Sequence, residues 1–273
     1  MANFTRSRNL PNVDRLSVLS AMILLAYALA SFVKLPVREI SIQLPGIYLA
    51  AEININTIVA LLVAGLTASG ADWLLRDHPA LGKNKTIEHW LLPALTAWVI
   101  GVVLFQLTPG MSWWVVFAVG GALLILVLVA EYIVVDPTDI RQGLAVVGLT
   151  AVSFALYLIL AIVLRSADLR LYLVLPAIIL VAGLVSLRTL HLRLHGQWKP
   201  VEALVIALIV GQVTAALHYW PVAPVTFGLA VLGPAYALTS LIGSLAEGAS
   251  LRQAIIEPAV VLIALLGAAF WLR

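Results

Sequence analysis

The residue types of this sequence that could do chemistry gather in short polar segments beside long apolar runs. Three such segments lie in the first half of the chain: ADWLLRDHP (71–79), IEHW (87–90) and AEYIVVDPTDIR (130–141). A fourth, LRTLHLRLHG (187–196), carries two histidines and two arginines. Carboxylates and histidines can exchange protons, and arginines can hold a phosphate or a carboxylate. These segments supply one candidate binding cluster, which consists of Asp72, Arg76, Asp77, His78, Glu88, His89, Glu131, Asp136, Arg188, His191 and His195.

The histidine pair of the fourth segment raises the question of a metal site. His191 and His195 lie four residues apart, so on a helix they would face the same side, as two ligands of one ion require. No glutamate stands next to the first histidine, as the zinc-protease motif requires, and Arg188 and Arg193 flank the pair and repel a cation. We therefore predict no metal and no cofactor, and we expect both histidines to face lipid headgroups at a basic helix end.

The composition indicates what kind of protein must position these residues. Hydrophobic residues make up 63% of the chain and charged residues 11%, with a mean hydropathy of +1.08. A soluble domain is about half apolar and a quarter charged, so the excess apolar surface must face lipid. The net charge of +3 is spread along the chain and indicates basic loops at one membrane face, not nucleic acid. The absence of cysteine excludes disulfides and thiolate-held zinc or iron–sulfur sites.

The apolar runs predict an all-α, polytopic bundle of about nine membrane spans. A span needs about 20 mostly apolar residues, and closed barrels need an alternation that this sequence lacks. The connections are too short for a soluble domain, so we expect one transmembrane domain over residues 1–273. The expected spans cover 16–34, 55–76, 88–107, 112–135, 143–165, 170–190, 201–219, 223–246 and 254–272.

One connection predicts β structure. The segment EISIQLPGIYLAAEININ (39–56) alternates apolar and polar residues, turns at Pro45-Gly46 and alternates again. This pattern is typical of a hairpin, which we place at about residues 37–55, between the first and second spans. The alternative is that residues from Ile47 onward lengthen the second helix.

The distribution of Lys and Arg predicts the orientation in the cytoplasmic (inner) membrane. With the N-terminus inside, 11 of the 16 basic residues fall at inner segments. Because basic residues are enriched on the cytoplasmic side, we expect the N-terminus in the cytoplasm, and nine spans then put the C-terminus outside. The hairpin is then extracytoplasmic, and the polar segments lie on the cytoplasmic face.

The centres of the predicted spans carry no Asp, Glu, Lys, Arg or His. A proton relay or a voltage sensor normally needs such residues. Interrupted helices can instead expose backbone groups to a cavity, as in secondary transporters. The alternative is a set of tolerated kinks with hydrogen bonds between helices. The candidate mid-membrane positions are Gln212, Thr214, Gly233, Pro234 and Tyr236.

Familiar catalytic motifs are missing from the sequence, which has no G-x-S-x-G, no Walker loop and no G-x-G-x-x-G. The segment GADWLLRDHP (70–79) followed by EHWLLPALTAW (88–98) resembles uncharacterised bacterial multipass membrane proteins of unknown function. The resemblance implies a membrane bundle over most of the chain and no particular activity.

Three functions are compatible with these observations. The first is transport or handling of a small or lipophilic molecule, which predicts a cavity that reaches Gln212 and the Gly233-Pro234 break. The second is a structural or accessory subunit, with other membrane subunits as partners and no cavity. The third is a membrane enzyme acting on lipid headgroups or isoprenoid phosphates, which predicts that the carboxylates of the first half converge at the cytoplasmic face. In each case we expect membrane lipids as partners, and whether any catalysis occurs stays open.

Overall fold

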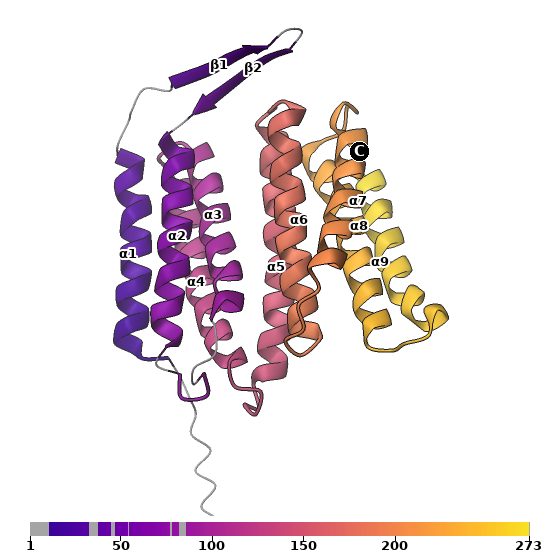
Figure 1. The fold of residues 1–273 in the computed structure, drawn as a ribbon. Helices are drawn as coiled ribbons and strands as arrows, with labels where there is room; N and C mark the ends of the chain where they lie inside the picture. Colours follow the sequence, from indigo (N-terminus) through magenta and orange to yellow (C-terminus); the bar gives the residue numbers. More distant parts are fainter. Residues whose placement is uncertain are drawn as a thin grey trace, which may run out of the picture. The chain divides into compact units, whose positions relative to one another are not determined.

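The chain is described from a computed structural model, which covers residues 11–32, 38–44, 47–53, 55–76, 78–81 and 86–272. Within these residues nine helices are long and apolar enough to cross a membrane, which confirms the predicted multispan helical class. Two compact units divide the chain, Met1–Gln142 and Gly143–Arg273, and each is described by itself. Figure 1 labels the elements of both units.

Four long helices build the first unit, unit 1. They are α1 (Val13–Phe32), α2 (Ile55–Leu75), α3 (Leu91–Gln106) and α4 (Met111–Val134), with the short 3-10 helix η1 (Ile87–His89) before α3. Their core is apolar and draws side chains from all four, among them Ile23, Leu74, Leu104 and Leu128. These helices are apolar on nearly every face, as lipid-facing helices are, so packing between them depends on close contacts more than on polarity.

One such close contact joins α1 to α3. The hydroxyl of Tyr27, a fully buried residue of α1, donates a hydrogen bond to the carbonyl of Ala97 in α3. Its ring passes over Gly101, where an added Cβ would lie 2.9 Å from the Tyr27 ring. Glycine at 101 therefore lets the two helices approach, as small residues do in membrane bundles.

Two strands lie between α1 and α2. They are β1 (Arg38–Leu44) and β2 (Ile47–Ile53), which pair antiparallel with Leu44 opposite Ile47 and Arg38 opposite Ile53. This segment falls within the range for which we expected a hairpin, and the turn residues Pro45 and Gly46 lie outside the described residues.

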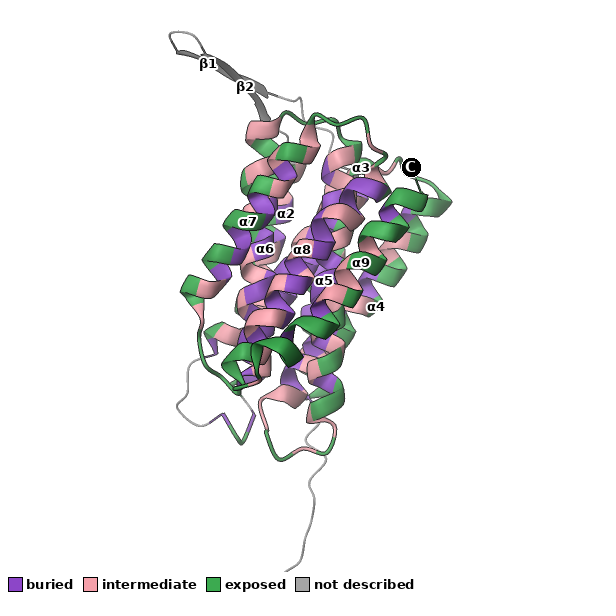
Figure 2. Ribbon diagram, turned by 90° about the vertical axis from the view of Figure 1, so that its right-hand side faces the viewer, coloured by how far each residue is buried: buried purple, intermediate pink, exposed green. Residues whose placement is uncertain are grey.

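The second unit, unit 2, contains five helices. They are α5 (Gln142–Ser166), α6 (Leu171–Arg193), α7 (Pro200–His218), α8 (Pro224–Ala246) and α9 (Leu251–Trp271). Helix α6 packs on α7 and α8, and α8 packs on α9. Figure 2 shows long exposed faces on α7 and α9, whereas α6 and α8 carry many buried residues. In a membrane, the exposed apolar faces meet lipid.

Proline and glycine explain several helix boundaries in unit 2. Pro200 and Pro224 stand at the first positions of α7 and α8, where a missing N–H costs nothing. Gly248, in a left-handed conformation with φ of 87°, ends α8. Of the two alternatives for Gly233-Pro234, an interrupted helix or a tolerated proline, the structure agrees with the second, because α8 runs unbroken through Pro234. Neighbouring helices tolerate such a proline inside a membrane helix.

Candidate functional site

The first polar group of unit 1 surrounds Asp72, in the last turn of α2. Arg76, one turn later on the same chain segment, bonds the Asp72 carboxylate through Nε at 2.8 Å and Nη2 at 2.7 Å. The hydroxyl of Thr86 donates to the other carboxylate oxygen, and the indole N–H of Trp90 donates to Thr86 at 3.2 Å. Asp72 therefore fixes the segment before η1 against the end of α2.

The second polar group of unit 1 is a buried pair. His89 Nδ1 lies 2.7 Å from Glu131 Oε2, and Glu131 is only 1% exposed. His89 Nε2 lies 3.5 Å from Glu88. We considered whether Asp72 and Glu131 pair with arginines on neighbouring helices. Asp72 instead uses Arg76 from its own chain segment, and the structure gives Glu131 the histidine of η1.

The third polar group connects His78 with the turn after α4. The His78 ring packs edge-on against Tyr132, and its Nδ1 accepts the backbone N–H of Ala80 at 3.1 Å. Burial lowers the pKa of His78, while Asp136 and Asp139 nearby act to raise it. Hydrogen bonds from Thr138 lower the pKa of Asp136.

Asp139 in the same turn is held by Arg141. Both guanidinium nitrogens that face the carboxylate bond it, Nε at 3.1 Å and Nη2 at 2.9 Å. These hydrogen bonds lower the pKa of Asp139 to about 2. The ion pair of Asp139 and Arg141 therefore lies within this one turn.

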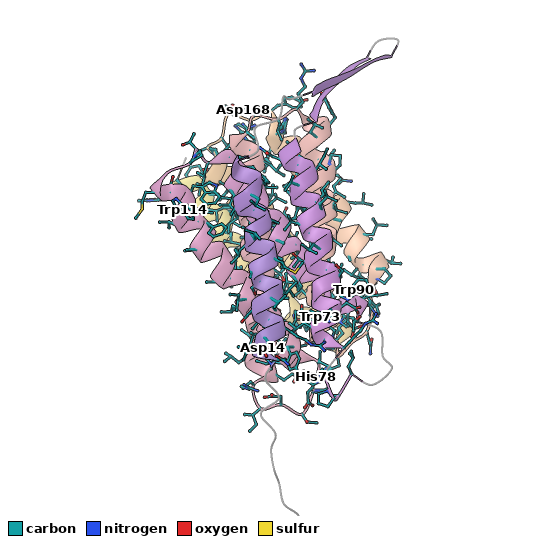
Figure 3. The ribbon with its side chains drawn as sticks, turned by 90° about the vertical axis from the view of Figure 1, so that its left-hand side faces the viewer. Asp14, Trp73, His78, Trp90, Trp114 and Asp168 are labelled. Atoms are coloured by element: carbon teal, nitrogen blue, oxygen red, sulfur yellow. The ribbon has the colours of Figure 1, made fainter. Side chains whose placement is uncertain are left out.

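Unit 1 thus brings most of its candidate residues to one end. Figure 3 shows Asp14, Trp73, His78 and Trp90 at that end, and Trp114 toward the other. The carboxylates of Asp72, Glu88, Glu131, Asp136 and Asp139 each have a partner within the unit, which is the pattern of a structural network. Among the described residues no group of three or more metal-binding side chains is close enough to hold an ion. Asp77 lies outside the described residues.

The candidate residues of unit 2 lie at the end of α6, and they correct one expectation. His191 is buried, with its ring against Trp198 and its Nδ1 3.3 Å from Arg188. It therefore does not face headgroups. His195 does not share its helical face either, because α6 ends at Arg193 and His195 adopts a left-handed φ of 52°. Arg188 is itself fully buried, so this end of α6 belongs to the packed interior.

A second polar network, built around Arg193, lies beside it. Arg193 holds Glu247 with two hydrogen bonds of 2.7 and 2.9 Å and donates to the carbonyl of Ser240 at 3.2 Å. The hydroxyl of Ser240 donates to Glu257 on α9 at 3.0 Å. The hydrogen bonds from Arg193 lower the pKa of Glu247, which lies just after α8. The sequence offered one indication of the two donors to Glu257, because Tyr236 and Ser240 are spaced i, i+4 and lie on one face of α8.

The five mid-membrane candidates have different surroundings. Gln212 is exposed on α7, and Thr214 is buried and bonds its own helix at the carbonyl of Val210. Gly233, next to Pro234, packs on α9, where an added Cβ would meet Leu262 at 2.9 Å. Tyr236 is the position that reaches a charged side chain, because its hydroxyl donates to Glu257 at 2.7 Å.

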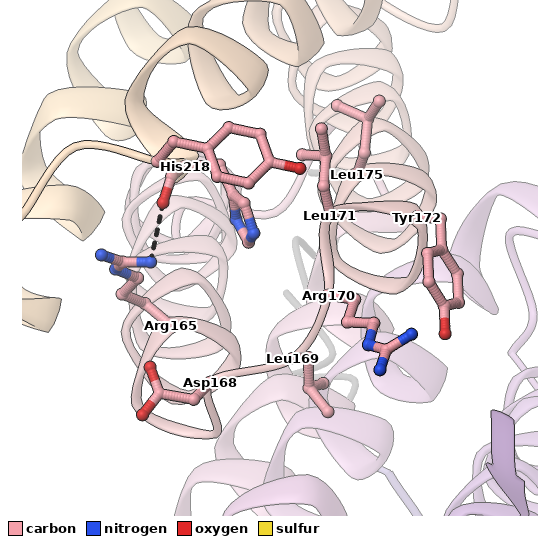
Figure 4. Close-up of a pocket in the computed structure, with 9 residues that line it drawn as sticks. Arg165, Asp168, Leu169, Arg170, Leu171, Tyr172, Leu175 and His218 are labelled. Carbon is pink, nitrogen blue, oxygen red and sulfur yellow. Dashed lines mark hydrogen bonds between the residues drawn. The ribbon is translucent and has the colours of Figure 1, made fainter. Parts of the chain in front are cut away.

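A pocket of about 750 Å³ lies at the opposite end of unit 2, where α5 ends, α6 begins and α7 ends. Figure 4 shows Arg165 and His218 on one side of this pocket, and Arg170 and Tyr172 on the other. Asp168, in a left-handed conformation with φ of 48°, turns the chain from α5 toward α6. The full lining is Arg165, Asp168, Leu169, Arg170, Leu171, Tyr172, Leu175, His218 and Tyr219.

The side chain of Arg165 is oriented by backbone carbonyls at the end of α7 and just after it. Arg165 donates from Nη1 to the carbonyl of His218 at 2.9 Å and from Nη2 to that of Trp220 at 3.0 Å. Its guanidinium also lies 5.7 Å from the centre of the Phe227 ring. Arg165 forms no salt bridge within the described part of the chain, so its charge is held in place and not neutralised. The buried Nδ1 of His218 has no hydrogen-bond partner there.

The helices and their polar ends define a multispan helical membrane protein. The chain matches, over residues 35–272, the family described as "Protein of unknown function (DUF5656)". It therefore belongs to this family. Comparison with curated proteins and with solved structures gives no match.

Proposed function

We propose that this membrane protein handles, by binding or transport, a lipophilic molecule with an anionic head, and that the pocket of unit 2 holds the head. The observation that carries the proposal is Arg165, a guanidinium fixed by two carbonyls in a pocket of about 750 Å³. A guanidinium presents paired N–H donors that match phosphate and carboxylate oxygens. Arg170, on the other side of the pocket, adds a second positive charge.

The remaining lining suits the rest of such a molecule. Leu169, Leu171 and Leu175 offer an apolar wall, and Tyr172 and Tyr219 offer rings with a polar edge. Tyrosine is typical of membrane interfaces, where one end of a ligand is wet and the other is in hydrocarbon. The carboxylate of Asp168 opposes an anion, and it leaves the lining with two arginines against one acid.

The pocket also favours this function over the two alternatives. An accessory subunit was expected to have no cavity. A membrane enzyme was expected to bring the carboxylates of the first half together at the cytoplasmic face, with a basic residue aimed at phosphate. In the structure, Asp72 is hydrogen-bonded to Arg76 and Thr86, and Glu131 is hydrogen-bonded to His89. These side chains stabilise the ends of the helices of unit 1.

For the orientation, we propose the cytoplasmic membrane with the N-terminus in the cytoplasm and β1 and β2 outside. The support is the excess of Lys and Arg at the ends assigned to the cytoplasm. In this orientation the pocket opens on the extracytoplasmic side, which is opposite to the side that we expected from the polar segments.

The test is binding of farnesyl phosphate, farnesol and inorganic phosphate to the purified protein in detergent. Farnesyl phosphate should bind at least about tenfold more tightly than farnesol, since a charge-assisted pair adds about 1.5–3 kcal/mol. Arg165→Gln should remove most of this difference. The matched control Arg141→Gln takes one arginine from unit 1 and should leave binding unchanged.

Two results would contradict the proposal. Equal affinity for farnesol and farnesyl phosphate would show that the arginines hold no anionic head. Inorganic phosphate that displaces farnesyl phosphate at equal concentration would identify a site for the free ion, without a role for the lipophilic chain.

A further inference from the structure

Glu257 of α9 is a carboxylate within a membrane span. Helix α9 begins at Leu251, so Glu257 lies six residues along it, about 9 Å from its first residue. The sequence had suggested a span that began at 254, which would leave Glu257 close to the helix end. The earlier start of α9 places it almost two turns inside the apolar helix.

Two hydroxyl groups donate hydrogen bonds to this carboxylate, and the Arg193 guanidinium interacts with it electrostatically without forming a salt bridge. Tyr236 donates to Oε1 at 2.7 Å and Ser240 donates to Oε2 at 3.0 Å. Glu257 forms no salt bridge within the described part of the chain. The charged group of α6 in this region, Arg193, bonds the carbonyl of Ser240 and holds Glu247 with its other nitrogens. Helix α5 contributes Phe154, which packs on the Tyr236 ring and cannot titrate.

An ionised carboxylate that no cation bonds directly is costly within a membrane span, and such residues commonly mark proton pathways. Two O–H donors stabilise its ionised form, while the surrounding hydrocarbon stabilises its neutral form. Both forms are therefore accommodated at this position. A carboxylate with only a structural role would be better served by the cation that Glu247 has.

A polar route connects Glu257 with water at the end of α8. It passes from Glu257 through Ser240 to Arg193 and then to Glu247, which is exposed just beyond α8. Pro258 follows Glu257 and has no N–H to give to the carbonyl of Ala254, so α9 has a free backbone acceptor one turn before the proline.

We propose that Glu257, Tyr236 and Ser240 form a proton-binding site inside the membrane, loaded and emptied from the end of unit 2 where Arg193 and Glu247 lie. Binding adds one proton to a carboxylate oxygen and removes one negative charge, and release returns the proton to water. The site lies at the other end of the helices from the arginine pocket, and it does not depend on what that pocket binds.

The experiment is labelling with dicyclohexylcarbodiimide, an apolar reagent that dissolves in the lipid phase. The O–H of a protonated carboxylic acid adds across one C=N bond, and the adduct rearranges to a stable acylurea that peptide mass spectrometry locates. We expect labelling of Glu257 in the wild-type protein in lipid vesicles. The labelling should fall at least about tenfold between about pH 6 and about pH 9, as the proton leaves.

Two variants and one reagent serve as controls. Tyr236→Phe removes a hydroxyl that bonds Glu257 and should change the pH dependence of the labelling, whereas Tyr157→Phe removes a buried hydroxyl without a hydrogen-bond partner in the described part of the chain and should not. A water-soluble carbodiimide, which does not enter the lipid phase, should spare Glu257.

The outcomes separate the proposal from its alternatives. Absence of labelling at every pH, or labelling that does not change with pH, would show a carboxylate with a structural role only. Protection by sodium chloride but not by choline chloride would identify a metal cation and overturn the proton site. The wild-type protein gives these answers, so none depends on a variant that folds poorly.

Discussion

The buried pair of unit 1 gives the prediction that the structure defines most sharply. Replacing His89 with Leu takes the partner at 2.7 Å from the carboxylate of Glu131, which is 1% exposed. Removing one partner of a buried pair costs about 3–5 kcal/mol, because the other partner loses this bond and stays away from water. At about 2–4 °C per kcal/mol, the melting temperature should fall by about 6–20 °C. Thermal melting in detergent, followed by tryptophan fluorescence, measures this fall.

The exposed pair at Asp72 is the matched control. Arg76 is 71% exposed, so its charge is largely screened by solvent. Arg76→Gln should therefore lower the free energy of unfolding by only about 0.3–0.5 kcal/mol, the usual worth of an i, i+4 pair.

The double variant His89→Leu/Glu131→Leu completes the test. Because an apolar pair of similar volume can replace a buried ion pair, the double variant should recover most of the stability that His89→Leu loses. The reasoning is refuted if His89→Leu melts within about 2 °C of the wild type, or if the double variant melts no higher than the single one.

Two further predictions concern acid and topology. Burial lowers the pKa of His78, so the stability that its neutral ring contributes is present above its ordinary pKa of 6.5 and is lost as the pH falls through the lower folded value. His78→Asn keeps an acceptor for the N–H of Ala80, so its acid melting profile should be flatter; an unchanged profile would exclude His78 as the cause. For the topology, Tyr48→Cys adds a thiol to a chain that has none, and a membrane-impermeant maleimide should label it from outside. Labelling from the cytoplasmic side alone would reverse the orientation.

The class of fold could be predicted from the sequence because lipid imposes a strong rule. Every backbone N–H and C=O in hydrocarbon must be paired, so runs of about 20 apolar residues become helices. The predicted spans and the helices agree within a few residues, as for 55–76 against Ile55–Leu75 and for 112–135 against Met111–Val134. The same rule does not choose side-chain partners, which depend on how each helix is rotated.

The end of α6 shows why a spacing argument failed. His191 and His195 would share a face only if the helix continued through both residues. The left-handed residues His195 and Gly196 end it instead, and the N–H of Gly196 bonds the carbonyl of His191 at 3.0 Å. This is a helix C-terminal motif in which glycine is common, and the Gly after His195 was its sequence signal.

The arginine pocket could not be found from the spacing of its residues. Arg165 is not among the candidate residues that the sequence indicates. Its orientation comes from the carbonyls of His218 and Trp220, which lie 53 and 55 residues further along the chain. Free carbonyls occur at the end of every helix, since the last turn has no N–H partners. The sequence therefore shows that an acceptor exists at the end of α7, and only the packing of α5 beside it shows which donor uses it.

Glu257 shows how a small shift of a helix boundary changes the interpretation of a residue. Glycine at 248 and the extended backbone of Ser250, with ψ of 147°, allow α9 to begin at Leu251. Because α9 begins three residues earlier than the predicted span, Glu257 lies about 4.5 Å further from the start of the helix than we expected. There its partners must come from the protein, and Tyr236 and Ser240 stand one turn apart on α8 to supply them. Depth, and not residue type, therefore separates Glu257 from Glu247, which keeps its arginine and its contact with water.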